Sequence, residues 1–182
     1  MKTINFKLTL LFVFLNICVS KGQFNEALAK EIASLDERFN LNGIEKIDAL
    51  NTLEEISSDI PESTIEIMLP GKTWKYSHSV NNKGRQYRVS NAIKRLDFSS
   101  NGNSFFTKGK KEAPVTSYCK WEYSVDFQLR LDLYENEERT SVTGTYYFGV
   151  HSATVDRLVI TKIIQSKESP GKSAILFQVY FR

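Results

Sequence analysis

From Ile67 to the last residue, apolar and polar side chains alternate in short runs, and this alternation constrains the fold more than any other feature of the chain. A period of two is typical of β-strands, because successive side chains of a strand point to opposite faces of a sheet. Turn-forming sequences, Asn-Asn-Lys-Gly at 81–84 and Ser-Ser-Asn-Gly at 99–102, separate some of the runs. The pattern predicts eight or nine short strands, over residues 74–80, 86–89, 93–98, 104–106, 120–125, 127–133, 142–150, 158–164 and 174–181.

Residues 23–66 have a different pattern, which is helical. Apolar residues recur there at spacings of three and four, at positions 24, 27, 28, 32 and 35. An Asn-Gly turn follows at 42–43, and a second apolar series predicts a second helix that ends before Pro61. Strands that follow one another without interposed helices favour an antiparallel arrangement over an α/β fold. We therefore predict a mainly β protein: an antiparallel up-and-down β-barrel of about eight strands over residues 67–182, preceded by a short α-helical segment.

The N-terminus has the pattern of a cleavable signal peptide. Lys2 and Lys7 precede residues 8–19, an apolar run shorter than the roughly 20 residues that span a bilayer. The two candidate cleavage sites follow Ser20 and Gly22, and cleavage after Gly22 places both small residues just before the cut. We predict that residues 1–22 are removed and that the mature chain has no transmembrane segment.

Two other interpretations of the N-terminus stay open. The apolar run could be retained as an anchor helix, or Cys18 could carry a lipid. The lipid anchor is disfavoured, because Asn16 and Ile17 stand where a lipoprotein signal has small residues.

The charge of the chain changes when the signal peptide is removed. The full sequence has 24 basic and 21 acidic residues, and three of the bases lie in residues 1–22. The mature chain is therefore neutral, which gives no support for nucleic-acid binding. Its charge is divided: residues 23–66 carry 11 acids and 3 bases, whereas residues 67–182 carry 10 acids and 18 bases. The acidic helices either dock on or solvate the barrel, or they guard a basic surface that binds an anionic partner.

The sequence offers little material for catalysis or for metal binding. His78 and His151 are the only histidines, and neither belongs to a metal-binding motif. Cys119 is the only cysteine of the mature chain, and we expect it to be a small buried apolar residue. No nucleophile elbow, phosphate-binding glycine loop or dinucleotide fingerprint occurs. We expect no cofactor, no metal and no catalytic residue; an enzyme would need His78, Glu122 and Tyr123 to converge.

Aromatic residues give the candidate binding site. Trp74 with Tyr76, and Trp121 with Tyr123, each place two rings on one face of a strand. A barrel of about eight strands is wide enough for packed side chains or for one small ligand. The residues expected to line such a cavity are Trp74, Tyr76, His78, Trp121 and Tyr123, although each ring could equally be core filler.

Residues 69–182 resemble the lipocalin-like domains that are common in exported proteins of the Bacteroidetes. The shared features are a Gly…Trp-Lys opening at 71–75, a Leu-x-Phe-x-x-Asn-Gly-x-x-Phe unit at 96–105, Lys-Trp-Glu at 120–122 and a patterned pair of strands over 147–160. The lipocalin signature is Gly-x-Trp, whereas this chain has one residue more between the glycine and Trp74. The resemblance implies that Trp74 plugs the closed end of the barrel and that a late basic residue, with Arg182 as candidate, stacks on it.

Together these observations favour an exported, non-enzymatic protein, periplasmic or secreted, that binds a small apolar or amphipathic ligand or lipid inside a β-barrel. The alternative is an envelope protein-interaction or assembly module, which would bind a protein partner through the basic barrel surface or through the acidic segment 23–66.

Overall fold

The computed structural model describes residues 26–57, 60–110, 113–123 and 128–182. The predicted signal peptide lies outside the described residues. Within these ranges, no helix has both the length and the apolar character needed to cross a membrane.

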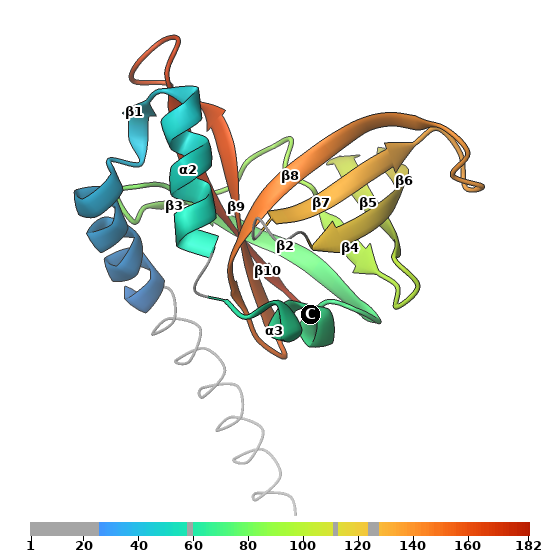
Figure 1. Cartoon of the computed structure of the whole chain (residues 1–182). Coiled ribbons are helices and arrows are strands. Elements are labelled where there is room, and N and C mark those ends of the chain that lie inside the picture. Colours follow the sequence, from blue (N-terminus) through green and yellow to red (C-terminus); the bar gives the residue numbers. More distant parts are fainter. Residues whose placement is uncertain (1–25, 58–59, 111–112, 124–127) are drawn as a thin grey trace, which may run out of the picture.

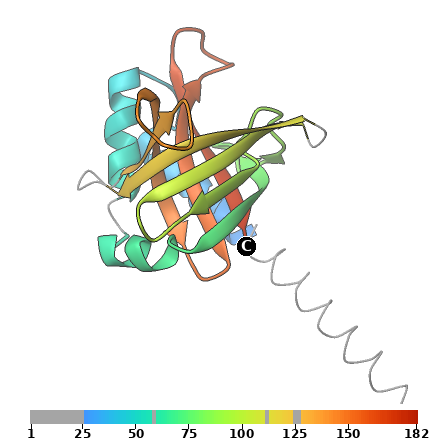
Figure 2. The ribbon, with the colours of Figure 1, turned by 90° about the vertical axis from the view of Figure 1, so that its right-hand side faces the viewer.

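Eight strands form a closed antiparallel ring (Figures 1 and 2). Each pairs with the next of these strands along the chain, and the last pairs back with the first, Phe177 opposite Val80. This confirms the predicted mainly β fold with an antiparallel up-and-down barrel of eight strands. The ring strands are β2 (Lys72–Val80), β4 (Arg95–Phe98), β5 (Asn103–Lys110), β6 (Ala113–Tyr123), β7 (Gln128–Tyr134), β8 (Val142–Ala153), β9 (Arg157–Gln165) and β10 (Ser173–Phe181).

Two short strands extend the ring at its margins. The strand β3 (Gln86–Tyr87) pairs with the end of β2, and β1 (Asn42–Ile44) pairs with the start of β10. A turn is predicted at 42–43, whereas the structure places these residues in β1. Gly43 has a φ of +78°, a conformation that glycine adopts without steric cost.

One end of the barrel is closed by side-chain packing. The inward faces of the strands contribute a continuous apolar cluster there, and a helix that the sequence pattern does not predict, α3 (Glu62–Met68), covers it from below (Figure 1). Ile65 and Leu69 insert from this helix and its end, and both are fully buried. The cluster further contains Trp74, Ile93, Leu96, Phe98, Phe106, Cys119, Tyr123, Leu129, Leu131, Phe148, Val150, Leu158, Ile160 and Tyr180.

The remaining helices cover the outside of the ring. The first helix, over residues 26–39, and α2 (Lys46–Ser57) lie against the outer face of β8, β9 and β10. Leu28 and Ile32 of the first helix share a second apolar cluster with Phe177 and Val179 of β10. Burial of this apolar surface stabilises the docked helices by removing it from water.

The second helix, α2, approaches the barrel closely because β8 has a glycine beneath it. A Cβ atom at Gly149 would lie 2.3 Å from the Thr161 hydroxyl, 2.4 Å from the Ser57 hydroxyl and 2.8 Å from Leu53 Cδ2. These distances are shorter than van der Waals contact, so any larger residue at 149 requires the helix or its side chains to move.

Bulges in two ring strands change which side chains point inward. On β2 the register shifts at Ser77: Tyr76 lies opposite Tyr180, and His78 lies opposite Val179. Tyr180 belongs to the inner cluster and Val179 to the outer one. Since directly paired residues share a face, His78 is on the outside of the barrel, away from Trp74 and Tyr76.

Candidate functional site

The upper part of the barrel is open between β8 and β9. These strands pair only from Gly149 opposite Thr161 to Ala153 opposite Leu158, and above that level they separate (Figure 1). Several inward residues of the upper level, Ile164 and Ala174 among them, are only partly buried, in contrast to the buried cluster at the closed end. We call this upper level the mouth; on β9 and β10 its apolar wall consists of Ile164, Ala174 and Leu176.

A pocket of about 280 Å³ lies at the rim of the mouth. Its apolar lining residues are Ile164, Ala174, Ile175 and Leu176, and its polar lining residues include Asn42, Asn81 and Glu168. This volume is close to the lower limit, about 300 Å³, of pockets that bind small molecules.

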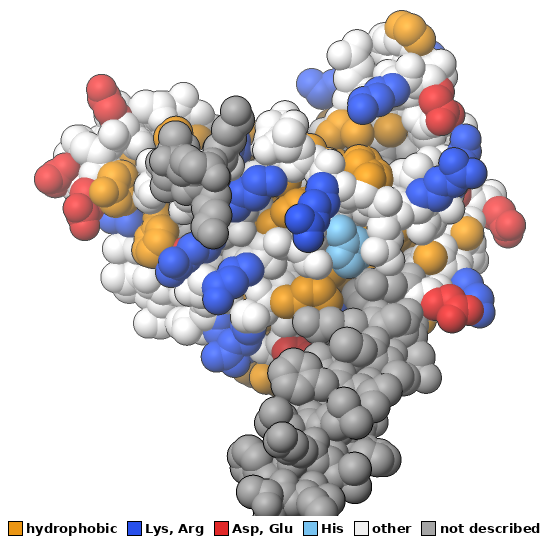
Figure 3. All heavy atoms as spheres, turned by 180° about the vertical axis from the view of Figure 1, so that it is seen from behind, with side chains coloured by type: hydrophobic (Ala, Val, Ile, Leu, Met, Phe, Trp, Pro, Cys, Tyr) orange, Lys and Arg blue, Asp and Glu red, His pale blue; other side chains and the backbone are white. Residues whose placement is uncertain are grey.

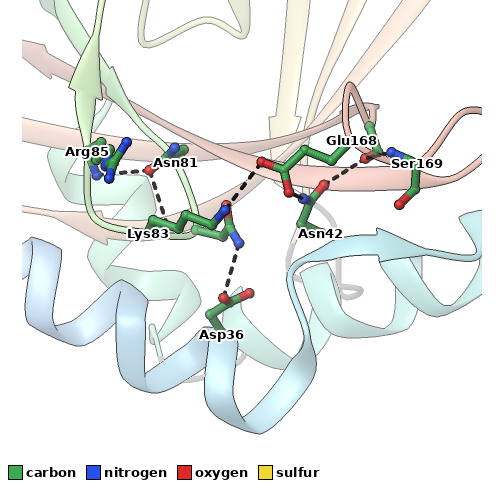
Figure 4. A network of polar contacts seen from close by, with 9 residues as sticks. Asp36, Asn42, Asn81, Lys83, Arg85, Glu168 and Ser169 are labelled. Carbon is green, nitrogen blue, oxygen red and sulfur yellow. Dashed lines mark hydrogen bonds and ion pairs between the residues drawn. The ribbon is translucent and has the colours of Figure 1, made fainter.

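A polar network fixes the rim around this pocket (Figure 4). The Glu168 carboxylate accepts a hydrogen bond of 2.8 Å from the Asn42 side chain, and it lies 3.4 Å from Lys83 Nζ. Asn82 donates to Asp36 of the first helix over 3.1 Å, and the Asn81 side chain accepts from the backbone N–H of Arg85. The network thus ties the β2–β3 turn, the β9–β10 hairpin, β1 and the first helix into one rim.

Three lysine side chains accompany aromatic rings at the mouth. Lys108 Nζ donates a hydrogen bond of 2.7 Å to the Tyr146 hydroxyl and lies 4.3 Å from the centroid of that ring. Lys162 Nζ lies 5.6 Å from the same centroid. Lys94 Nζ lies 5.0 Å from the ring of Tyr76 and donates to the carbonyl of Val89. The sequence pattern does not single out these lysines as site residues, although Lys162 stands in the apolar register of Ile160 and Ile164.

Three of the five predicted cavity residues lie inside the barrel at or near its closed end. Trp74 is fully buried, and Tyr123 is 7% exposed. Tyr76 packs edge-on against Tyr180 with ring centroids 5.7 Å apart, and its hydroxyl is bonded to Ser79 and to the backbone N–H of Val89. None of the three lines the rim pocket. Burial raises the pKa of the Tyr180 hydroxyl, as expected for an apolar surrounding.

Of the other two predicted residues, Trp121 is partly buried and packs at the margin of the same inner cluster, whereas His78 lies outside it. Trp121 packs against Phe98 at the closed end, donates its indole N–H to the carbonyl of Ser99 over 2.9 Å, and lines a second pocket of about 260 Å³ beside Gly102 and Arg130. His78 is on the outer face, where burial and the nearby Arg88 lower its pKa. The structure therefore brings Trp74, Tyr76 and Tyr123 into one core and leaves His78 outside it.

The predicted stacking of Arg182 on Trp74 does not occur. Arg182 is exposed, and its backbone N–H donates to the carbonyl of Asp156. Within the part of the chain that the structure describes, no cation–π contact joins it to Trp74, whose ring is fully buried.

The three residues that an enzyme would need, His78, Glu122 and Tyr123, do not converge in one site. Tyr123 faces the barrel interior and its neighbour Glu122 faces outward, because adjacent residues of β6 alternate. His78 lies on the outer face of β2, which β4 and β5 separate from β6. Among the described residues, no cluster of three potential metal ligands occurs.

His151 is the bulged residue of β8 and lies under the first helix. Its ring packs edge-on against Phe177 at 5.1 Å, and its Nε2 lies 3.3 Å from the Glu31 carboxylate. The contact with His151 holds the pKa of Glu31 below its usual value. This histidine therefore helps to fasten the first helix to the barrel.

Cys119 is fully buried inside the barrel, and burial raises the pKa of its thiol to about 12. At pH 8 this lowers the thiolate fraction about 1000-fold relative to a thiol of pKa 9. We expect a disulfide reagent to leave the thiol of the folded mature chain unmodified at pH 8, and to modify one thiol per chain in 8 M urea. Rapid modification of the folded chain, measured by absorbance, would contradict this placement.

Basic side chains gather on one outer face of the molecule. Figure 3 shows Lys and Arg side chains across the middle of the back face, with most of the acidic side chains at its margins. On β2 and in the β2–β3 region, Lys75, Arg85 and Arg88 are exposed. Basic side chains therefore predominate in the middle of the face that Figure 3 shows.

No protein-family model matches the sequence, and no curated protein matches it. Solved structures with similar barrels include the LTBP1–LTC4 complex, with 12% identity, 69% of this chain and 71% of that chain covered, and a TM-score of 0.43. A second similar structure is the deswapped triple mutant of bovine odorant-binding protein. It has 14% identity, covers 61% of this chain and 72% of that chain, and has a TM-score of 0.36. The complex of bovine odorant-binding protein with a selenium-containing odorant has 16% identity, covers 68% of this chain and 74% of that chain, and has a TM-score of 0.37. These distant likenesses assign no ligand to this chain.

Proposed function

We propose that this chain is a non-enzymatic binding protein that holds a small apolar or amphipathic ligand at the mouth of its barrel. The observation that carries the proposal is the contrast between the two ends of the barrel. The closed end is packed with side chains, whereas at the mouth the partly exposed Ile164 and Ala174 and the buried Leu176 line a pocket of about 280 Å³. A concave, mostly preformed apolar surface with a few polar groups is typical of small-molecule sites.

The ligand position in this proposal differs from the one that the aromatic pairs indicate. Trp74, Tyr123 and Trp121 act in it as the packed base of the barrel, and Tyr76 is the predicted residue nearest the mouth through its contact with Lys94. The polar network that joins Asn42, Lys83 and Glu168 holds the rim in place before the ligand arrives. Such preorganisation lowers the entropic cost of binding.

We propose in addition that the protein is exported, as in the lipocalin-like proteins of the Bacteroidetes that it resembles, and that residues 1–22 are its signal peptide. The support is the pattern of Lys2 and Lys7 followed by the apolar run 8–19 and small residues before the cut. Expression of the full chain with N-terminal sequencing of the exported product tests this: Gln23 is expected as the first residue.

A pocket-filling variant tests the binding function. Ala174→Leu adds three carbon atoms to the wall of the rim pocket, whereas Thr116→Leu places a leucine at an exposed outward position of β6. We expect ligands found by native mass spectrometry and thermal shift to bind Ala174→Leu at least tenfold more weakly and Thr116→Leu as well as wild type. Equal binding by the wild type and Ala174→Leu would place the ligand elsewhere.

A second function, as a protein-interaction or assembly module, is favoured by the basic back face (Figure 3). Exposed bases of the barrel domain, such as Arg85 and Arg88, would recognise an acidic partner. The double variant Arg85→Glu and Arg88→Glu would abolish capture of such a partner and leave small-ligand binding unchanged.

A further inference from the structure

The inward face of the barrel carries cations at its mouth. Lys162 lies between Ile160 and Ile164 on the inward face of β9 and is paired with Leu176 of β10, a residue of the rim pocket. Lys108 follows Phe106 on the inward face of β5. Both side chains are partly buried, and both ammonium groups lie within 6 Å of the centroid of one ring, that of Tyr146.

No carboxylate accompanies these cations. Within the described ranges, no ion pair joins Lys94, Lys108 or Lys162 to an acidic side chain, and the inward positions of the ring strands carry no Asp or Glu. Partial burial and the charge of Lys108 lower the pKa of Lys162. A cation withdrawn from water without a counter-charge opposes folding, so the fold itself gives no reason for two lysines at this level.

The Tyr146 hydroxyl completes an arrangement of donors. It accepts the hydrogen bond from Lys108, which leaves its own O–H proton available to donate to a third group. Two ammonium groups and one hydroxyl around a single ring form a set of donors suited to an oxyanion, because charge-assisted hydrogen bonds to carboxylate are short and strong.

We propose that the ligand of the mouth is an amphipathic carboxylic acid, whose carboxylate binds between Lys108 and Lys162 with the Tyr146 hydroxyl as a further donor. Its apolar part lies against Ile164, Ala174 and Leu176. This inference rests on the proposed binding function and adds the chemical class of the ligand. The competing explanation is that the rings of Phe106 and Tyr146 alone compensate the lysine charge through cation–π contacts, the Phe106 centroid being 5.0 Å from Lys108 Nζ.

A matched set of ligands tests the proposal on the mature chain, residues 23–182. Decanoic acid has both a long apolar chain and a carboxylate. Decanol has the apolar chain without the carboxylate, and acetate has the carboxylate without the long chain. By isothermal titration calorimetry at pH 7.5, we expect decanoic acid to bind at least tenfold more tightly than decanol and acetate not to bind detectably. Saturable acetate binding that matches decanoic acid would show a free-anion site and overturn the proposal.

Variants of the lysines test which residues cause the preference for decanoic acid over decanol. In the double variant Lys108→Met and Lys162→Met, we expect the acid and the alcohol to bind within twofold of each other, while Lys75→Met, on an exposed outward lysine of β2, keeps the tenfold preference. Without ligand, the double variant should melt at a higher temperature than the wild type, because two poorly compensated cations are removed. A lower melting temperature would show that the lysines stabilise the fold and would overturn the proposal.

The outcomes separate the two proposals. Equal binding of acid and alcohol by the wild type, or an unchanged preference in the double variant, would overturn the carboxylate site and leave the binding function standing. If neither decanoic acid, decanol nor a broader lipid panel binds, both proposals fail.

Discussion

Replacing Gly149 by alanine is expected to cost about 3 kcal/mol of stability, the upper part of the range for overpacked cores. The added methyl group would lie 2.3 Å from the Thr161 hydroxyl and 2.4 Å from that of Ser57, and both side chains are fully buried. Leu53 Cδ2, at 2.8 Å, blocks a third direction. Because the contacts come from the barrel and from α2 at once, the helix has to move away from the strands. Urea unfolding, followed by far-UV circular dichroism, measures the loss.

The same strand provides the control for this prediction. Gly144 also lies on β8, and a Cβ atom there has no neighbour within 4 Å. Gly144→Ala is therefore expected to be neutral or to stabilise by about 0.5 kcal/mol, since alanine loses less backbone entropy on folding. In the Gly149→Ala background, Leu53→Ala should cost less than in the wild type, because it relieves one of the three contacts. Equal effects of the two glycine substitutions would contradict the close approach of α2.

Trp74→Ala is expected to cost about 4 kcal/mol, within the range for removing a fully buried tryptophan. Trp74 is fully buried at the base of the barrel, and α3 covers that base through Ile65 and Leu69. The indole N–H of Trp74 has no hydrogen-bond partner among the described residues, so the loss reflects packing rather than a broken hydrogen bond. With an unfolding slope of about 2 kcal/mol per molar urea, the midpoint should fall by about 2 M.

Trp121→Ala is the matched control, because it deletes the same atoms from a partly exposed site of the same end of the barrel. It removes an edge-on contact with Phe98 and the hydrogen bond to Ser99, for which we expect about 2 kcal/mol. A loss from Trp121→Ala as large as that from Trp74→Ala would show that the base is not organised around Trp74.

The barrel could be predicted because each strand and each turn is marked by the residues of its own short segment. Alternation in runs such as 127–133 and 158–164 identifies strands, and the turns between them are short enough to require antiparallel neighbours. The closure of the ring, with β10 beside β2, followed from the resemblance and from the number of strands. The helix α3 was missed because its seven residues, Glu62–Met68, are too few to establish a helical period.

The candidate site was less predictable, and bulges are one reason. The alternation Trp74, Tyr76, His78 places all three on one face of an ideal strand, but the extra residue at Ser77 turns His78 outward. Nothing in the sequence marks that position. The lysines were missed for a different reason: a charged residue in an apolar register, such as Lys162, is normally taken for an exposed one. The signal was present in the spacing Ile160, Lys162, Ile164.

The pairing of β2 with β10 also determines how this protein can fold. Lys75 and Phe181, which lie side by side in the closed ring, belong to the first and the last of its strands. Their contact requires the closure of a very long loop. The chain loses conformational entropy when this loop closes, before the new strand pairing can compensate for that loss. The hairpins from β4 to β9 can form early and locally, but the ring stays open until the final strand arrives. Because this pairing is non-local, folding should be slow, in the range of milliseconds to seconds typical of β-barrels with non-local contacts.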